Sequence, residues 1–237
     1  MKENFLKEFI VQEFELNNIK IIQEQISLLL YFMRFLLEEN AKYNLTAITE
    51  PEDIVRKHFI DSCFSAEFIK KDSKIIDIGA GGGFPGIPLA ILRPDCEFIL
   101  VDSVVKKVDF LKKAIKSLKL LNCKAVCGRG EELAHKLEYR EKFDYCVARV
   151  VARLNTLCEY CFPFIKIEGE MIAYKSKDSK KEILEAKNAI KILGGRVRLE
   201  KEFKLCEMER SLIFIEKEKS TPLKYPRGQN KAKTNPL

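Results

Sequence analysis

A glycine-rich stretch constrains the fold of this chain more than any other feature. Residues 74–88 read Lys-Ile-Ile-Asp-Ile-Gly-Ala-Gly-Gly-Gly-Phe-Pro-Gly-Ile-Pro. The first part is apolar and β-branched, as a buried strand requires, and glycine suits a place where a ligand approaches the backbone too closely for a Cβ. A strand that runs into glycines and then into an apolar helix is typical of the place where an α/β sheet binds a nucleotide-like ligand.

Two classes of ligand fit this loop. Residues 81–86 match the dinucleotide-binding fingerprint G-x-G-x-x-G, whereas residues 77–83 match the D-x-G-x-G-x-G loop with which class I methyltransferases bind S-adenosylmethionine. In either interpretation, Asp102 at the end of the next predicted strand, 97–101, can bind a pair of ribose hydroxyls. A tight turn without a ligand is a third interpretation, but such a turn seldom needs so many glycines.

The order of the predicted elements separates the first two interpretations. Strands expected at 124–127, 143–148 and 170–174 alternate with helices, which predicts a parallel sheet. Two closing strands, about 197–204 and 211–216, have so short a connection that they must pair antiparallel. Five parallel strands followed by an antiparallel pair form the class I methyltransferase sheet. Too few residues remain for the substrate domain that a nicotinamide-dependent enzyme normally carries.

We expect three regions along the 237-residue chain. Residues 1–66 form helices packed on the core, because apolar residues recur at helical spacing within 22–37. Residues 67–217 form an α/β, Rossmann-like sheet of parallel strands with a terminal antiparallel hairpin. Residues 218–237 lack a periodic apolar face and carry basic residues without any acid from Lys219 onward, so we predict a flexible tail that binds a polyanion.

Composition argues against several classes of protein. No run of about 18 apolar residues exists, so we predict no membrane span, and early acidic residues argue against a signal peptide. The pairs Cys123-x3-Cys127 and Cys158-x2-Cys161 resemble zinc ligands. However, Cys127 falls on a predicted strand and the second pair on a predicted helix, so we expect reduced thiols, no metal and a cytoplasmic protein. The net charge of +7 favours a polyanionic partner.

Several motifs together resemble one known family, over roughly residues 20–237. They are Tyr43-Asn44-Leu45-Thr46, Arg56-x-His58-x-x-Asp61-Ser62, residues 77–88, Arg93-Pro94, Val101-Asp102-Ser103, Lys106-Lys107-x-x-Phe110-Leu111, Ala148-Arg149 and residues 221–227. The chain is similar to the bacterial 16S ribosomal RNA guanine-N7 methyltransferases, also called the glucose-inhibited division protein B family. The resemblance implies methyl transfer from S-adenosyl-L-methionine to N7 of a guanine in the decoding-region loop of small-subunit RNA. The sequence departs from the family pattern at Val150, at Ser176 and after Arg227.

The chemistry of this reaction requires no general base. Guanine N7 already presents a lone pair in the major groove. The chain also lacks the Pro-Cys motif of cytosine-C5 methylation and the Asn-Pro-Pro-Tyr and Asp-Pro-Pro-Tyr motifs of amino methylation. We therefore name no catalytic base, and we interpret His58 as a packed histidine with a hydrogen-bond partner rather than as a catalytic group.

We expect the donor site to be lined by the glycine loop and by residues that follow later strands: Gly79, Gly81, Gly83, Phe84, Asp102, Gly130, Glu131 and Arg149. In this set Asp102 binds the ribose, while Gly130 and Glu131 flank the adenine. The resemblance implies that Arg149 contacts the donor or positions the target base.

The basic residues around the site are expected to contact RNA phosphates: Lys106, Lys107, Lys175, Lys177, Lys224 and Arg227. The predicted partner is 16S ribosomal RNA or a precursor of the small ribosomal subunit, with the protein acting as a monomer. Four alternatives stay open: an NAD-dependent oxidoreductase, a methyltransferase that acts on a different RNA, a methyltransferase that acts on a protein or a small molecule, and a non-catalytic RNA-binding module.

Overall fold

A seven-stranded sheet forms the centre of the molecule, in the order β3-β2-β1-β4-β5-β7-β6. The computed structural model describes residues 2–149 and 151–237, so Val150, where the sequence departs from the family pattern, lies outside the described residues. The strands are β1 Lys74–Ile78, β2 Glu97–Asp102, β3 Cys123–Cys127, β4 Phe143–Arg149, β5 Ile165–Ser176, β6 Gly195–Leu205 and β7 Met208–Lys217.

The strand directions confirm the predicted sheet. β1 pairs in parallel with β2 on one side and with β4 on the other, and β3 and β5 extend the parallel part. β7 then pairs antiparallel with both β5 and β6. The hairpin therefore inserts its second strand next to the parallel strands. The reversal of strand order at β1 creates the switch point at which α/β sheets bind ligands.

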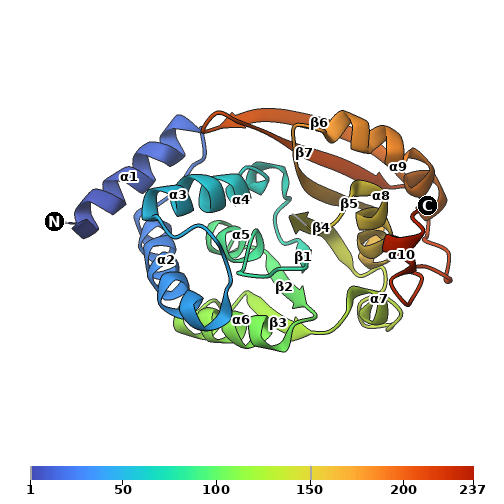
Figure 1. The fold of residues 1–237 in the computed structure, drawn as a ribbon, viewed down its shortest axis with the longest axis horizontal. Helices are drawn as coiled ribbons and strands as arrows, with labels where there is room; N and C mark the ends of the chain where they lie inside the picture. The colour runs from blue at the N-terminus through green and yellow to red at the C-terminus, as the bar shows by residue number, and fades with distance from the viewer. Residues whose placement is uncertain (1, 150) are drawn as a thin grey trace.

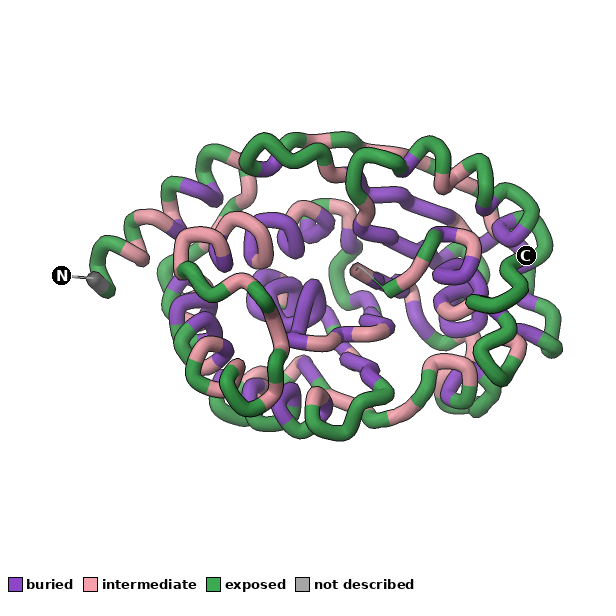
Figure 2. The backbone as a smooth tube through the Cα atoms, viewed as in Figure 1, coloured by how far each residue is buried: buried purple, intermediate pink, exposed green. Residues whose placement is uncertain are grey.

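Helices cover both faces of the sheet (Figure 1). One face carries α1 Lys2–Leu16, α2 Gln23–Tyr43, α3 Pro51–Ile54, α4 Asp61–Cys63, α5 Gly86–Leu92 and α6 Val105–Ser117, together with a π-helical segment, Val55–Ile60. The other carries α7 Gly130–Leu133, α8 Leu154–Cys161, α9 Ser179–Leu193 and α10 Lys231–Thr234. Figure 2 shows that the central strands β1, β2 and β4 and the inner turns of these helices are largely buried, whereas the edge strand β6 is mostly exposed or half-buried.

Alternation along the strands divides the core into two apolar clusters. Ile75 and Val147 pack toward α2, α5 and α6, whereas their neighbours Ile76 and Ala148 pack toward α8 and α9. Successive side chains of a strand point to opposite faces, so a strand with helices on both faces is apolar throughout. Among the described residues, no helix combines the length and the apolar character needed to cross a membrane.

The C-terminal segment, residues 218–237, is packed against the core, so the prediction of a flexible tail was wrong. It runs beside α8 (Figure 1) and buries Thr221, Tyr225 and Ala232. Isolated side chains anchor the segment, without an amphipathic helix or strand, so hydrophobic periodicity did not reveal it. The boundaries at residues 66 and 217 stay predictions.

Candidate functional site

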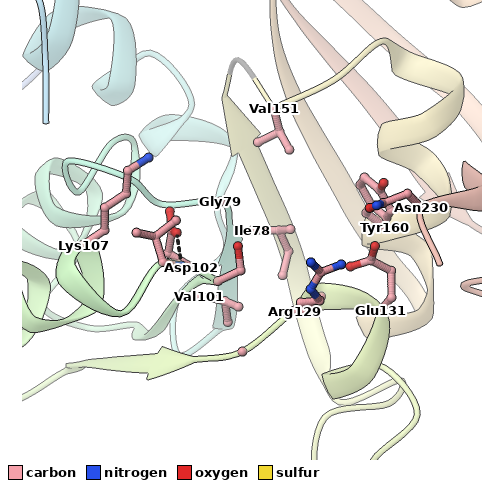
Figure 3. A pocket seen from close by; sticks show the side chains of 14 residues that line it. Ile78, Gly79, Val101, Asp102, Lys107, Arg129, Glu131, Val151, Tyr160 and Asn230 are labelled. Atoms are coloured by element: carbon pink, nitrogen blue, oxygen red, sulfur yellow. Dashed lines mark hydrogen bonds between the residues drawn. The ribbon is translucent and has the colours of Figure 1, made fainter. Parts of the chain in front are cut away.

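A cavity of about 400 Å³ opens at the carboxyl ends of β1 and β2. Of the predicted donor-site residues, Gly79, Asp102, Gly130 and Glu131 line it, and so does Lys107, which we predicted as an RNA contact. Figure 3 shows Lys107 and Asp102 on one side of this cavity and Arg129, Glu131, Tyr160 and Asn230 on the other. Tyr160 and Asn230 were not predicted from the sequence, because they reach the cavity from α8 and from the C-terminal segment.

The glycine loop owes its shape to backbone conformations that other residues rarely adopt. Gly79 and Gly81 have φ values of +77° and +55°. A Cβ on Gly79 would lie 2.8 Å from Cγ2 of Val151, whereas a Cβ on Gly81 would meet no atom closer than 3.8 Å. Gly79 thus provides both conformation and space at the cavity, and Gly81 provides conformation.

Two predicted lining residues, Gly81 and Gly83, support the loop and do not line the cavity. The Gly81 N–H donates to Asp102 Oδ2 at 3.0 Å. A Cβ on Gly83 would lie 2.6 Å from Cδ1 of Ile87, so this glycine allows close packing of the loop on α5. The turn of the chain places Gly79 at the cavity, whereas Gly81 and Gly83 do not line it.

Asp102 is held rigidly at the cavity. Its Oδ2 accepts the Gly81 N–H, and its Oδ1 accepts the Val104 N–H at 2.9 Å. Each carboxylate oxygen has a second lone pair, so both oxygens can still accept a hydrogen bond from a ligand. An oriented, largely buried carboxylate of this kind suits two adjacent hydroxyl donors.

Asp77 is a buried carboxyl group beneath the same loop. Its Oδ2 accepts the Gly86 N–H at 2.9 Å, while Oδ1 has no hydrogen-bond partner among the described residues. Burial raises the pKa of Asp77 to about 7, against the lowering effects of the Gly86 N–H and the charge of Arg149. Buried polar atoms normally find partners. Asp77 does not line the cavity, so its Oδ1 is suited to a buried water and not to the ligand.

Arg149 is oriented away from the cavity and into an ion-pair network. Its NH1 donates to Asp61 Oδ2 at 2.9 Å, and its NH2 donates to His58 Nδ1 at 3.0 Å. The guanidinium lies 5.0 Å from the centre of the Phe84 ring. Neither Arg149 nor Phe84 lines the cavity. These side chains pack on one another and on the 55–61 region, and their contact with the donor or the target base stays a prediction.

His58 is a packed histidine with partners at both ring nitrogens, as predicted. A guanidinium has only donors, so Nδ1 accepts from Arg149. Nε2 then carries the hydrogen and donates to Thr46 Oγ1 at 2.8 Å. Burial, followed by the charge of Arg149, lowers the pKa of His58 to about 3. This imidazole stays neutral at ordinary pH and is a poor proton acceptor.

Asp61 joins two arginines from different strands. It is buried and accepts from Arg149 of β4 and from Arg210 of β7, whose Nε lies 2.9 Å from Oδ1. Arg210 also lines a second hollow of about 410 Å³, which shares Val151 with the first cavity. The sequence analysis assigned no role to Asp61 or Arg210, although Asp61 stands in one of the motifs that carry the family resemblance.

Two of the predicted RNA contacts already have protein partners. Lys175 Nζ lies 2.7 Å from both Glu182 Oε2 and Ala152 O, and its side chain is 9% exposed. Arg227 makes a bidentate pair with the buried Glu159. Both are internally paired cations in the structure, and their contact with RNA phosphates stays a prediction. Three other predicted contacts, Lys106, Lys177 and Lys224, are exposed.

The cysteines form no disulfide in the structure, and all but Cys127 and Cys206 are buried. Within residues 2–149 and 151–237, no three His, Cys, Asp or Glu side chains gather as they would around a metal ion.

Comparison with known families gives one match that spans most of the chain. The model of the family GidB, described as rRNA small subunit methyltransferase G, matches residues 25–213. A relative from Alkaliphilus metalliredigens, named ribosomal RNA small subunit methyltransferase G, is 44% identical over 221 residues that cover 92% of each chain. A relative of the same name from Clostridium tetani is 46% identical over 84% of this chain and 85% of its own.

Solved structures share the fold at low identity. TYW2 from M. jannaschii, crystallised in complex with AdoMet, is 15% identical and has a TM-score of 0.54 over 66% of this chain and 74% of its own. A SAM-dependent O-methyltransferase from Thermotoga maritima is 15% identical, with a TM-score of 0.51 over 78% of this chain and 71% of its own. These likenesses support the class I methyltransferase fold.

Proposed function

The chain belongs to the rRNA small subunit methyltransferase G (GidB) family of S-adenosylmethionine-dependent methyltransferases, and we propose that it methylates N7 of a guanine in the decoding-region loop of 16S ribosomal RNA. The observation that carries this proposal is the fixed Asp102 carboxylate beside the glycine loop, in a chain of this family. We further propose that the enzyme acts in the cytoplasm as a monomer on 16S RNA or on a precursor of the small subunit.

The residues around the first cavity fit the donor. Its volume, about 400 Å³, lies in the range of small-molecule sites. Gly79 leaves room for close approach, Asp102 would bind the ribose hydroxyls, and Ile78, Val101 and Tyr160 offer apolar surface to the adenine. When bound, S-adenosylmethionine supplies an electrophilic methyl group on a sulfonium.

The chain's own contribution to the reaction is orientation and not proton transfer. Guanine N7 presents its lone pair without prior deprotonation. The low pKa of His58 and its two occupied ring nitrogens exclude this histidine as a base. Reactants held in the correct orientation can recover roughly 7–11 kcal/mol of a bimolecular barrier. The two adjoining hollows would provide this orientation by holding the donor and the target base side by side.

We assign the target base to the second hollow, which adjoins the donor cavity at Val151. It is lined by Arg210, Lys175 and Glu182, among others. Arg210 donates hydrogen bonds from Nε and Nη2 to Asp61, and its Nη1 makes no hydrogen bond among the described residues. A donor at this place suits guanine O6 and leaves N7 free to attack. The exposed Lys106 and Lys177, with Lys224, would hold the RNA backbone.

Methyl transfer to extracted 16S RNA tests the proposal. The purified protein is incubated with labelled S-adenosylmethionine and the RNA, and the product nucleosides are identified by mass spectrometry. We expect 7-methylguanosine; another methylated nucleoside, or transfer only to a different RNA, would contradict the proposal. In a thermal-shift assay, S-adenosylhomocysteine should raise the melting temperature and NAD should not. The opposite pattern would favour the oxidoreductase.

A further inference from the structure

The C-terminal segment forms one wall of the donor cavity. Asn230 lines the cavity beside Tyr160, on the side opposite Asp102 (Figure 3). We propose that the C-terminal segment brings Asn230 to the donor site, where its side-chain amide binds the adenine of the donor. This inference rests on the proposed function, because it presumes a donor that contains adenosine.

The segment is fastened on both sides of Asn230. Before it, Arg227 donates to the buried Glu159 from its backbone N at 2.7 Å and from its guanidinium at 2.9 and 2.7 Å. After it, the carbonyl of the buried Ala232 accepts from Thr156 Oγ1 at 3.0 Å. Both anchors lie on α8, which also provides Tyr160. The wall is therefore a fixed part of the fold.

Farther upstream, Arg140 and His135 hold the same segment. The Arg140 guanidinium donates to the carbonyls of Thr221 and Tyr225 at 2.8 and 2.9 Å. His135 Nε2 lies 3.0 Å from the carbonyl of Pro226. These contacts come from the region between α7 and β4. Gly130 and Glu131, which line the cavity, are the first residues of α7. The path of the C-terminal segment is thus tied to the same side of the cavity.

The backbone of Asn230 is engaged, whereas its amide is not. Asn230 adopts the left-handed conformation, with φ 57°, and its carbonyl accepts from the backbone N–H of Lys233 and Thr234. Its side chain makes no hydrogen bond among the described residues. An asparagine amide carries a donor and an acceptor side by side. It can therefore pair with adenine through N7 and the 6-amino group. Asp102 and Asn230 would then hold the ribose and the base from opposite walls.

A matched pair of glycine variants tests this assignment. Asn230→Gly removes the amide at a position where glycine tolerates the positive φ. Gln229→Gly is the control, because Gln229 also has φ 57° and is exposed, but does not line the cavity. Calorimetric titration with S-adenosylhomocysteine should give about tenfold weaker binding for Asn230→Gly, as expected for the loss of a bidentate base contact, and unchanged binding for Gln229→Gly.

A deaminated ligand supplies a second readout that loss of structure would not produce. S-inosylhomocysteine carries an oxygen in place of the 6-amino group, so the wild type should prefer S-adenosylhomocysteine, and Asn230→Gly should lower that preference several-fold. Equal affinity of wild type and Asn230→Gly for S-adenosylhomocysteine, or an unchanged preference, would overturn the assignment and leave the proposed function intact. Failure of the wild type to bind S-adenosylhomocysteine would instead refute the proposed function.

Discussion

Asp102 and Arg149 each end a parallel strand at the same edge of the sheet, yet only Asp102 faces the donor cavity. Asp102 is held there by the Val104 N–H of its own loop and by the Gly81 N–H of the glycine loop. Arg149 is instead drawn toward Asp61 and His58 on the helical side. The direction of a side chain at the end of a strand therefore depends on the hydrogen-bond and ion-pair partners that surround it in the folded protein.

We predict that Asp102→Asn weakens the binding of S-adenosylhomocysteine by about 10- to 100-fold. The amide keeps the shape of the carboxylate but loses its charge and one acceptor, and hydrogen bonds to charged groups contribute about 1.5–3 kcal/mol. Calorimetric titration measures the effect. Asp109→Asn, on the exposed side of α6, serves as the control and should bind like the wild type. Equal affinities for the two variants would rule out Asp102 as the ribose ligand.

His58 makes stability depend on pH. Its pKa is about 3 in the folded protein and about 6.5 in an unfolded chain. Below pH 6.5 the unfolded state therefore binds a proton that the folded state does not. The stability that neutral His58 contributes is complete above pH 6.5 and falls as the pH falls toward 3.

Denaturant unfolding at pH 7.5 and 5.5 checks this effect. Between these values the wild type should lose about 1.4 kcal/mol more unfolding free energy than His58→Gln, which has no such group to titrate. An identical change in the two proteins would mean that His58 titrates alike in the folded and unfolded states.

At the scale of elements, α8 and the C-terminal segment form one packed unit. Glu159 of α8 is fully buried, and its charge is balanced by Arg227. Lys217, at the end of β7, is also buried and pairs with Glu141. Because the Glu159 carboxylate is buried, the segment cannot leave the core without leaving that charge unpaired.

We predict that Arg227→Ala lowers the unfolding free energy by about 3–5 kcal/mol, because it leaves Glu159 buried without a partner. Lys224→Ala, an exposed change in the same segment, should alter it by less than about 0.5 kcal/mol. Urea titrations of both variants provide the measurement. Loss of less than about 1 kcal/mol in Arg227→Ala would indicate that the segment is not anchored through this pair.

At the scale of the whole molecule, the chain has a net charge of +7, but not every basic side chain is free to contact RNA. Lys175, Arg149 and Arg227 are all paired inside the protein. Two exposed lysines remain beside the hollows: Lys106 is next to Lys107, which lines the first cavity, and Lys177 is next to Ser176, which lines the second. Affinity for RNA should therefore depend on a few exposed lysines at one edge of the sheet.

We expect the double variant Lys106→Ala and Lys177→Ala to weaken RNA binding and to lower the slope of log affinity against log salt by about 0.7–0.9 for each lost contact. Binding isotherms with 16S RNA at several salt concentrations measure that slope. Lys70→Ala is the control, because Lys70 is exposed at the amino ends of the strands, the edge opposite the cavity. A slope equal to that of the control would exclude the two lysines from the RNA interface.

The sequence by itself determined the sheet and the position of the donor loop. Both follow from local signals: apolar strands that alternate with helices, a connection between β6 and β7 too short for a parallel pair, and glycines that follow β1. Such signals depend only on residues that are close along the chain, so they can be recognised before the packing is known. For the same reason Gly79, Asp102, Gly130 and Glu131 could be placed at the cavity in advance.

Only the tertiary structure decided which charged side chains are available and where the C-terminal segment runs. The partners of Arg149, Lys175 and Arg227 come from other elements, and no residue spacing in the sequence predicts these ion pairs. The segment that brings Asn230 to the cavity has no periodic apolar face, and single side chains of α8 and of the region between α7 and β4 hold it. Ion pairing and burial are set by long-range contacts, and a linear pattern does not contain them.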